Sequence, residues 1–252
     1  PPPRISGEII QLRMDEPLER VEVAVRNRDR AAIVVRSIRL QVKGFRGPGA
    51  MPEEAPIPAG QVVNLPVPYG AVRCSTAGEA QVGRPKVTME VQRAGTGPVR
   101  TVRITATDPQ RYLARIAERA CAVEQLLSHV DLRFADRWRL ERTGEGTVAH
   151  GTLLAVWRDG PAREVVDLAG AILYGLRPDG VRPPYARIGP QHRQARIPVV
   201  VYAARCDKHT IGEIKKPYEF LVWLTRPGGD PLAITPAIGE PTKRRLRSVC
   251  AF

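Results

Sequence analysis

Apolar and polar residues alternate along several short segments of the chain. The alternation is strict at residues 20–26, 37–43 and 86–92. A period of two places one face of a β-strand on a core and the other in water, which is typical of antiparallel sheets. Further strand candidates are residues 7–14, 62–74, 99–105, 148–157, 165–174, 196–204, 218–225 and 231–235. About seven short strands within about 110 residues indicate an immunoglobulin-like β-sandwich.

Two segments have no period and are rich in proline and glycine. They are residues 47–60 and 180–194. Proline and glycine interrupt regular structure, so we expect a long loop at each of these positions.

The middle of the chain has the period of an amphipathic helix. Asp108 is a suitable N-cap and Pro109 suits the first helical position, so we expect a helix from Asp108 to Val130. Its apolar stripe consists of Leu113, Ile116, Ala117, Ala120, Val123 and Leu127. A shorter helix is expected near the C-terminus, from Glu240 to Val249.

The second half of the chain repeats the first. Three pairs of segments are separated by the same distance along the chain, which we call the repeat offset: Arg73-Cys74 with Arg205-Cys206, Leu65-Pro66 with Ile197-Pro198, and Asp108-Pro109 with Glu240-Pro241. Self-similarity at a fixed offset indicates a duplicated unit. We therefore predict two homologous domains, 1–126 and 127–252. The predicted fold is mainly β, with two tandem immunoglobulin-like antiparallel β-sandwich domains, each closed by a C-terminal helix.

Each repeat contains two cysteines at matching positions. Four cysteines allow three pairings, and the duplication favours Cys74 with Cys121 and Cys206 with Cys250. Disulfides persist in oxidising compartments, so this pairing predicts an extracellular or cell-envelope protein. The alternative is a cytosolic protein with four buried free thiols.

One strand differs between the two repeats on its polar face. At the repeat offset, the polar face of strand 86–92 becomes Phe220, Val222 and Leu224. The opposite face is apolar in both repeats, so the second strand needs cover on both sides. We therefore interpret Phe220, Val222 and Leu224 as an interdomain surface or a partner surface.

Basic residues exceed acidic ones throughout the chain. Lys and Arg total 39 against 26 Asp and Glu, which gives a net charge of +13. The excess is spread over both halves, and such a surface attracts anionic polymers weakly. Basic residues cluster at Arg26/Arg28/Arg30, Arg133/Arg137/Arg139/Arg142, Lys215-Lys216 and Lys243-Arg244-Arg245-Arg247.

The last of these clusters is the candidate anion-binding site, formed by Lys243, Arg244, Arg245 and Arg247. Nucleic-acid binding needs basic residues interleaved with exposed aromatic residues, and only Trp138 lies among the basic residues. Nucleic acid is therefore not expected as a ligand.

The sequence contains no established enzyme or metal motif. It has no GxGxxG or phosphate loop, no GxSxG elbow and no HExxH, and its cysteines form no CxxC pair. Asp207, His209 and His192 could approach one another near Cys206, but scattered polar residues usually form a solvated loop. We therefore predict no catalytic, cofactor-binding or metal-binding residues and no cofactor.

The junction of the two repeats carries a more extended pattern. An Asp-Pro…Leu…Cys segment closes the first repeat and is followed by Val130-Asp131-Leu132-Arg133-Phe134, Trp138 and Gly151-Thr152-Leu153. This arrangement resembles a group of uncharacterised exported proteins of high-GC Gram-positive bacteria with tandem immunoglobulin-like domains. The resemblance implies an envelope location and this tandem architecture, and it adds no catalytic residues.

These observations predict a non-catalytic binding or scaffolding protein of the bacterial cell envelope, whose partner is an envelope protein or an anionic polymer. One alternative is a binder of anionic envelope polymers through an arginine-rich surface, with affinity that falls steeply with salt. The other is an enzyme of unrecognised type near Asp207 and His209. The chain opens on Pro1-Pro2-Pro3-Arg4. Membrane association is expected only through a signal or anchor segment removed with the native N-terminus.

Overall fold

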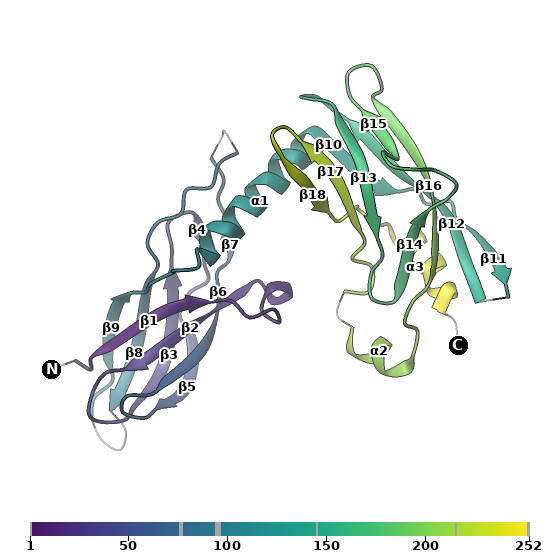
Figure 1. Ribbon diagram of the computed structural model, residues 1–252. Coiled ribbons are helices and arrows are strands. Elements are labelled where there is room, and N and C mark those ends of the chain that lie inside the picture. The colour runs from purple at the N-terminus through teal and green to yellow at the C-terminus, as the bar shows by residue number, and fades with distance from the viewer. Residues whose placement is uncertain (1, 76–77, 94–96, 145, 215, 251–252) are drawn as a thin grey trace. The chain divides into compact units, whose positions relative to one another are not determined.

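A computed structural model describes residues 2–75, 78–93, 97–144, 146–214 and 216–250 (Figure 1). The chain divides into two compact units, Pro1–Ala122 (unit 1) and Val123–Phe252 (unit 2). The boundary falls inside helix α1 (Tyr112–His129), slightly before the predicted division at residues 126 and 127.

Unit 1 consists of two main antiparallel sheets around one core. The first sheet has the order β1 (Ile5–Ile10), β2 (Arg20–Asn27), β6 (Val62–Pro68). The second has the order β5 (Met51–Ile57), β3 (Ile33–Gln41), β8 (Lys86–Arg93), β9 (Arg100–Thr105). A short 3-10 helix, η1 (Glu16–Leu18), and a ribbon of β4 (Phe45–Arg46) and β7 (Ala71–Val72) complete the unit.

Unit 2 has the same two sheets with additions. Its first sheet has the order β10 (Val130–Phe134), β12 (Gly146–Trp157), β16 (Gln194–Ala203), β14 (Tyr174–Pro178), and β11 (Arg139–Thr143) also pairs with β12. Its second sheet has the order β15 (Ala186–Ile188), β13 (Arg163–Ala169), β17 (Leu221–Arg226), β18 (Gly229–Ile234). Its helices are α2 (Lys208–Glu213), α3 (Glu240–Arg247) and η2 (Ser248–Cys250).

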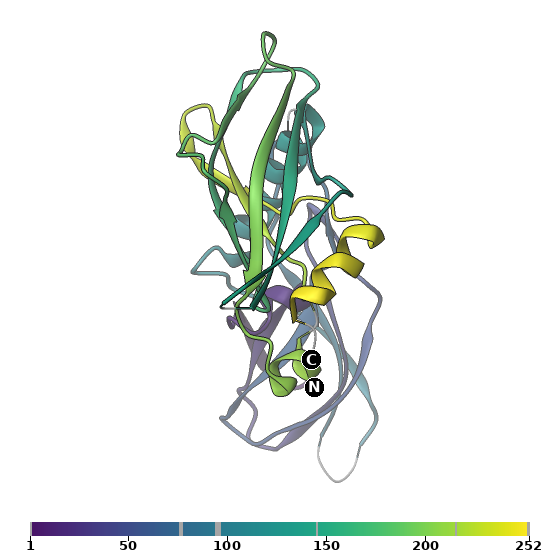
Figure 2. The ribbon, with the colours of Figure 1, turned by 90° about the vertical axis from the view of Figure 1, so that its right-hand side faces the viewer.

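The strand order of each unit is that of an immunoglobulin-like sandwich. The first, second and fifth major strands form one sheet, and the third, fourth, sixth and seventh form the other. All pairings between these strands are antiparallel. Helix α3 packs on the sandwich of unit 2 through Thr242 and Leu246, both fully buried (Figure 2). The predicted mainly β, immunoglobulin-like fold class is confirmed.

Details of register support the duplication. In unit 1 the β3–β8 ladder is irregular between Val35 and Ser37, and in unit 2 the β13–β17 ladder is irregular between Val165 and Asp167. A parallel bridge also joins the first strand of each unit to the segment after its last strand, at Glu8–Thr107 and at Arg133–Ala237. Bulges and isolated bridges are specific features of a backbone, so the two units share details of register as well as strand order.

Both predicted disulfides are present. Cys74 is bonded to Cys121 with a Cα–Cα distance of 5.5 Å, and Cys206 to Cys250 with a distance of 5.4 Å. The first links the segment after β7 to helix α1, and the second links the segment before α2 to η2. No described helix is both long enough and apolar enough to span a membrane.

The two predicted loops each contain a strand that sequence reasoning missed. Strand β5 lies within residues 47–60 and strand β15 within residues 180–194. Both are edge strands, which pair on one side only. Because an edge strand tolerates proline, Pro52 and Pro56 in β5 hid its alternation.

Helix α1 begins later than predicted, at Tyr112. Arg111 has a left-handed backbone conformation with φ of 53°, so Asp108 and Pro109 lie in a turn before the helix. Asp108 still caps the helix, because its carboxylate accepts from the backbone N–H groups of Tyr112 (2.8 Å) and Leu113 (3.1 Å). The predicted stripe is wrong at its end, where Leu127 is exposed and its neighbour Leu126 is buried.

The prediction of a partner or interdomain surface at Phe220, Val222 and Leu224 is wrong. All three side chains are fully buried in the core of unit 2 itself. The true counterparts of these residues are Val87, Met89 and Val91, which are buried in the same way in unit 1. Corresponding residues of these two strands are therefore one position further apart along the chain than the repeat offset. A shift of one residue exchanges the two faces of a strand, so the apolar face was assigned to the wrong side.

Candidate anion-binding groove

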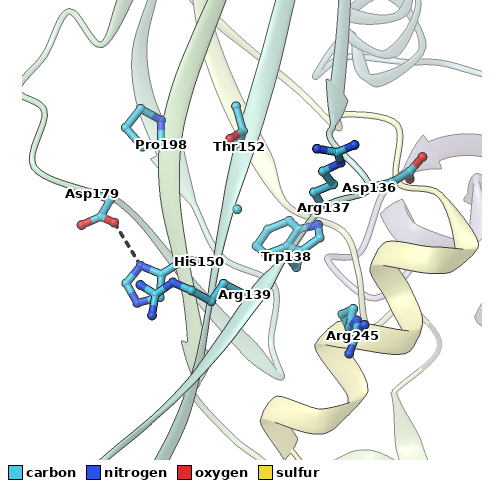
Figure 3. A pocket seen from close by; sticks show the side chains of 10 residues that line it. Asp136, Arg137, Trp138, Arg139, His150, Thr152, Asp179, Pro198 and Arg245 are labelled. Carbon is cyan, nitrogen blue, oxygen red and sulfur yellow. Dashed lines mark hydrogen bonds and ion pairs between the residues drawn. The ribbon is translucent and has the colours of Figure 1, made fainter.

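An open groove of about 600 Å³ lies on unit 2 (Figure 3). Its lining comes from the β10–β11 connection, strands β11, β12 and β16, the residue that follows β14, and helix α3. The lining residues are Asp136, Arg137, Trp138, Arg139, His150, Gly151, Thr152, Asp179, Pro198 and Arg245. Most of these side chains are titratable, so the groove is mainly polar and charged.

The groove lies where the chain leaves the edge of strand β12 and returns to it. Strand β10 pairs with β12 up to Phe134, the Ala135 N–H donates to the Thr152 carbonyl (2.9 Å), and β11 resumes pairing at Arg139 opposite His150. The residues from 136 to 138 thus stand opposite Gly151 alone. Bulges redirect side chains and are over-represented next to active sites.

Trp138 fixes the shape of the bulge. Its indole ring lies over Gly151, where any side-chain carbon would clash with the ring. Its Nε1 donates to Thr242 Oγ1 (3.1 Å), and Thr242 Oγ1 donates to the Ala135 carbonyl (3.3 Å). The ring also packs 5.8 Å from the Phe134 ring, between centroids. Trp138 therefore ties the bulge to α3 and to the core, and this rigid base positions the neighbouring arginine at 137.

A chain of polar contacts occupies one side of the groove. Arg139 Nη1 lies 2.7 Å from Glu141 Oε2, which lies 3.3 Å from His150 Nε2. His150 Nδ1 lies 3.0 Å from Asp179 Oδ2 (Figure 3). The hydrogen bond and the charge of Arg139 lower the pKa of the Glu141 carboxyl. Because a carboxylate faces each ring nitrogen of His150, neither nitrogen is free to activate a nucleophile as a general base.

Two arginines of the groove lack such partners. Among the residues that the structure describes, no hydrogen bond or ion pair engages the guanidinium groups of Arg137 and Arg245. They come from the bulge and from α3, and both flank Trp138 (Figure 3). Two unpaired guanidinium groups on a rigid base can bind carboxylate or phosphate groups.

The predicted anion-binding cluster at α3 is divided by the structure. Of its four members, only Arg245 lines the groove. Lys243 is paired with Glu240 at 2.7 Å, which lowers the pKa of the Glu240 carboxyl. Arg244 and Arg247 are exposed and do not line the groove. Lys215, predicted to form another cluster with Lys216, lies outside the described residues.

The polar residues near Cys206 each make local contacts. Asp207 is the N-cap of α2, and its carboxylate accepts from the Thr210 N–H (2.9 Å), which lowers the pKa of that carboxyl. His209 pairs with Glu213 at 3.4 Å on an exposed helix face, and His192 lies in a tight turn with Gly189. No group of three or more His, Cys, Asp or Glu side chains is placed to hold a metal ion anywhere in the described residues.

Sequence reasoning identified Arg137 and Trp138 as part of a basic cluster with one aromatic residue but used the cluster only to argue against nucleic acid as a ligand. The signal that could have identified the bulge is Gly151, a glycine inside an otherwise well-patterned strand, which often marks close approach of another group. The contribution of Arg245, which is remote along the chain, depends on the position of α3 and has no local signal.

No family model matches the chain, and a comparison with curated protein sequences finds no match. Among solved structures, the YadV chaperone is 12% identical with a TM-score of 0.25, over 92% of this chain and 97% of that one. A protein of unknown function from Porphyromonas gingivalis W83 is 11% identical with a TM-score of 0.23, over 94% and 99%. The CsuC–CsuE chaperone–tip adhesion subunit pre-assembly complex from Acinetobacter baumannii is 11% identical with a TM-score of 0.22, over 95% and 100%. At these TM-scores the likenesses carry no argument about function.

Proposed function

We propose that this protein is a non-catalytic binding protein of the bacterial cell envelope that binds an anionic polymer through the groove of unit 2. The observation that carries the proposal is the pair Arg137 and Arg245, two guanidinium groups without acidic partners among the described residues, on either side of Trp138. This proposal joins the predicted binding function to the arginine-rich surface that was predicted as its alternative.

The chemistry of the groove favours carboxylate or phosphate groups repeated along a chain. The groove is open, so an extended polymer can lie in it without being enclosed. Arginine forms two parallel hydrogen bonds to a carboxylate or phosphate, and these charge-assisted bonds are stronger than neutral ones. Two such contacts, together with the surrounding charge of +13 for the whole chain, favour polyanions over neutral ligands.

The two disulfides support the envelope location. Each unit is closed by one disulfide, and structural disulfides are typical of proteins that fold in oxidising compartments. An anionic polymer of the cell surface is therefore the source of ligand that we propose. An enzyme of unrecognised type is the weaker hypothesis, because His150 already faces carboxylates at both ring nitrogens.

Binding of fluorescently labelled poly-L-glutamate to the full chain tests the proposal. We expect the affinity to fall by more than about tenfold between about 50 and about 200 mM salt, because binding releases counterions. Replacing both Arg137 and Arg245 by alanine should lower the affinity about tenfold and reduce the salt dependence.

The matched control removes the same charge elsewhere. Arg103 on β9 and Arg244 on α3 are both exposed and lie outside the groove, so the Arg103→Ala/Arg244→Ala variant should bind within about twofold of wild type. Equal losses in the two double variants would show that general surface charge binds the polymer. Salt-insensitive binding to a protein of the envelope would favour the scaffolding function instead.

A further inference from the structure

Arg163 is a buried cation without a counter-charge. It is the first residue of β13 and only 7% exposed. Its Nη1 contacts only the carbonyl of its neighbour Ala162, at 3.4 Å, and its Nε is buried with no hydrogen-bond partner. No acidic side chain among the described residues forms an ion pair with it. Burial lowers the pKa of the Arg163 guanidinium.

Unit 1 has an apolar residue at the position that corresponds to Arg163. Arg163 pairs with Ile188 of β15, and the corresponding pair in unit 1 is Ile33 with Ile57 of β5. The next inward residue is a buried valine in both units. Ile33 is fully buried in the unit 1 core. An isoleucine therefore suits this position of the sandwich, and the arginine of unit 2 has another cause.

An unpaired buried charge opposes folding, because the group leaves water without gaining an opposite charge or a full set of hydrogen bonds. Buried polar groups in folded proteins are nearly always satisfied, so each exception needs a reason. We propose that Arg163 is the binding residue of a second ligand site in unit 2, which takes a single oxyanion group, a carboxylate or a phosphate, from an anionic ligand.

A second cation contacts the connection that leads to Arg163. Trp157, the last residue of β12, and Arg163 lie at opposite ends of the same short connection between β12 and β13. The Arg193 guanidinium lies over the Trp157 ring at 5.4 Å, and the backbone N–H of Trp157 donates to the Arg193 carbonyl (2.8 Å). Arg193 thus adds a second cation at this end of unit 2. The carboxylate of this connection, Asp159, is engaged by His129.

Nuclear magnetic resonance of the full chain, labelled with ¹⁵N, tests the site directly. The Nε–H signal of Arg163, assigned by its loss in an Arg163→Lys variant, should shift in a saturable way on addition of inorganic phosphate or sodium acetate at constant ionic strength. The Nε–H signal of the exposed Arg103 serves as the control and should show only a small, linear change. Saturation by acetate alone would assign a carboxylate ligand, and saturation by phosphate alone a phosphate ligand. No saturable shift of the Arg163 signal with either anion would overturn the proposal.

Thermal unfolding gives an independent test. In chloride buffer, Arg163→Ile should have a higher melting temperature than wild type, by a few degrees, because it restores the residue found in unit 1. Phosphate or acetate should raise the melting temperature of wild type by more than that of Arg163→Ile, since both chains share the groove and the general effect of the salt but only wild type has the Arg163 site. An Arg163→Met variant, which keeps a long unbranched side chain, repeats the test if isoleucine does not fit.

A lower melting temperature for both Arg163→Ile and Arg163→Met in chloride would show that the arginine is structural and would refute the proposal. The groove does not confound the result. The Arg137→Ala/Arg245→Ala variant should keep the saturable response of the Arg163 signal even if it has lost polymer binding.

Discussion

The first strand of unit 1 and the first strand of unit 2 continue differently. Strand β1 ends at Ile10 and the chain leaves the sheet, whereas β10 is followed by the bulge at residues 136–138 and then by β11 on the same edge of β12. Strand β12 has 12 residues against 8 in its counterpart β2, and the added length pairs with β11. The groove is therefore particular to unit 2, where the shared framework has an additional strand pairing at the edge of β12.

The second difference is a single position. Ile33 of unit 1 corresponds to Arg163 of unit 2, inside an otherwise equivalent strand. At both places unit 2 carries arginines that lack acidic partners among the described residues. Unit 1 forms the same sandwich without these arginines, so the framework does not need them. We therefore assign function to the arginines of unit 2 and use unit 1 as the internal control for experiments.

The strongest test of the comparison concerns the register of β8 and β17. Val87→Glu and Phe220→Glu should each destabilise the chain by more than about 4 kcal/mol, because each buries a charge without a partner. Thr88→Glu, on the outer face of β8, should change the free energy of unfolding by less than about 0.5 kcal/mol. Urea unfolding measures all three. A large loss of stability for Thr88→Glu with little for Val87→Glu would contradict this register and support the alignment at the repeat offset, in which Thr88 corresponds to Phe220.

The disulfides give the next largest effect. They join residues 47 and 44 positions apart, so the chain-entropy model assigns each about 4 kcal/mol. Replacing Cys74 and Cys121 by alanine, or Cys206 and Cys250, should therefore cost nearly the same. Urea unfolding with peptide-level hydrogen exchange identifies the unit that opens. Strongly unequal costs would mean that the two bridges do not have equivalent roles.

Asn27 is a buried polar anchor of unit 1 that an aromatic residue replaces in unit 2. Its fully buried Nδ2 group faces the carbonyls of Ala31 (2.9 Å), Ile57 (3.0 Å) and Pro58 (3.2 Å), and the corresponding last residue of β12 is Trp157. Asn27→Ala should cost about 2 kcal/mol, because the buried carbonyl of Ile57 loses its donor. The control is the matching substitution of the exposed asparagine in β6, Asn64→Ala, which should change stability by less than about 0.5 kcal/mol. Similar losses of stability in both variants would show that Asn27 is not an anchor particular to unit 1.

The smallest predicted effect is a pH dependence specific to unit 1. Burial raises the pKa of the Glu22 carboxyl above 4.5, and the neighbouring Asp15 carboxylate raises it further. The folded chain then holds this proton more tightly than the unfolded chain, so the free energy of unfolding decreases as the pH rises above about 4.5. Glu22→Gln should be more stable than wild type at neutral pH, with a weaker decrease over this range. The control is Glu8→Gln, on the exposed face of β1, which should keep the wild-type pH dependence of the free energy of unfolding. The same pH dependence in Glu22→Gln would contradict the assignment of this effect to Glu22.

The duplication made most of the framework predictable. Two cysteines per repeat at matching positions were enough to choose one pairing of three, and the strictly alternating strands β2 and β8 were located within a residue or two. These features depend on local pattern and on spacing, which a sequence displays directly.

The rest depended on relations that the pattern does not display. Pro85 and Pro217, just before β8 and β17, are still separated by the repeat offset. Unit 2 then has one extra residue before β17, so an alignment at the repeat offset exchanges the inner and outer faces of that strand. Edge strand β5 was hidden by its prolines. The groove joins Arg137 to Arg245, and only the packing of α3 beside the bulge brings these two residues to one site. The sequence does not show that Arg163 is buried, or that it has no acidic partner among the described residues, because both properties depend on the fold.

Hydrogen exchange of the full chain with and without saturating poly-L-glutamate tests the central claim, that anion binding belongs to the features particular to unit 2. We predict slower exchange in the bulge around Trp138 and in the first turns of α3, with unit 1 unchanged. Protection spread over both units, or protection that is strongest on the arginines of β9 in unit 1, would contradict this account and return the positive charge to a general property of the surface.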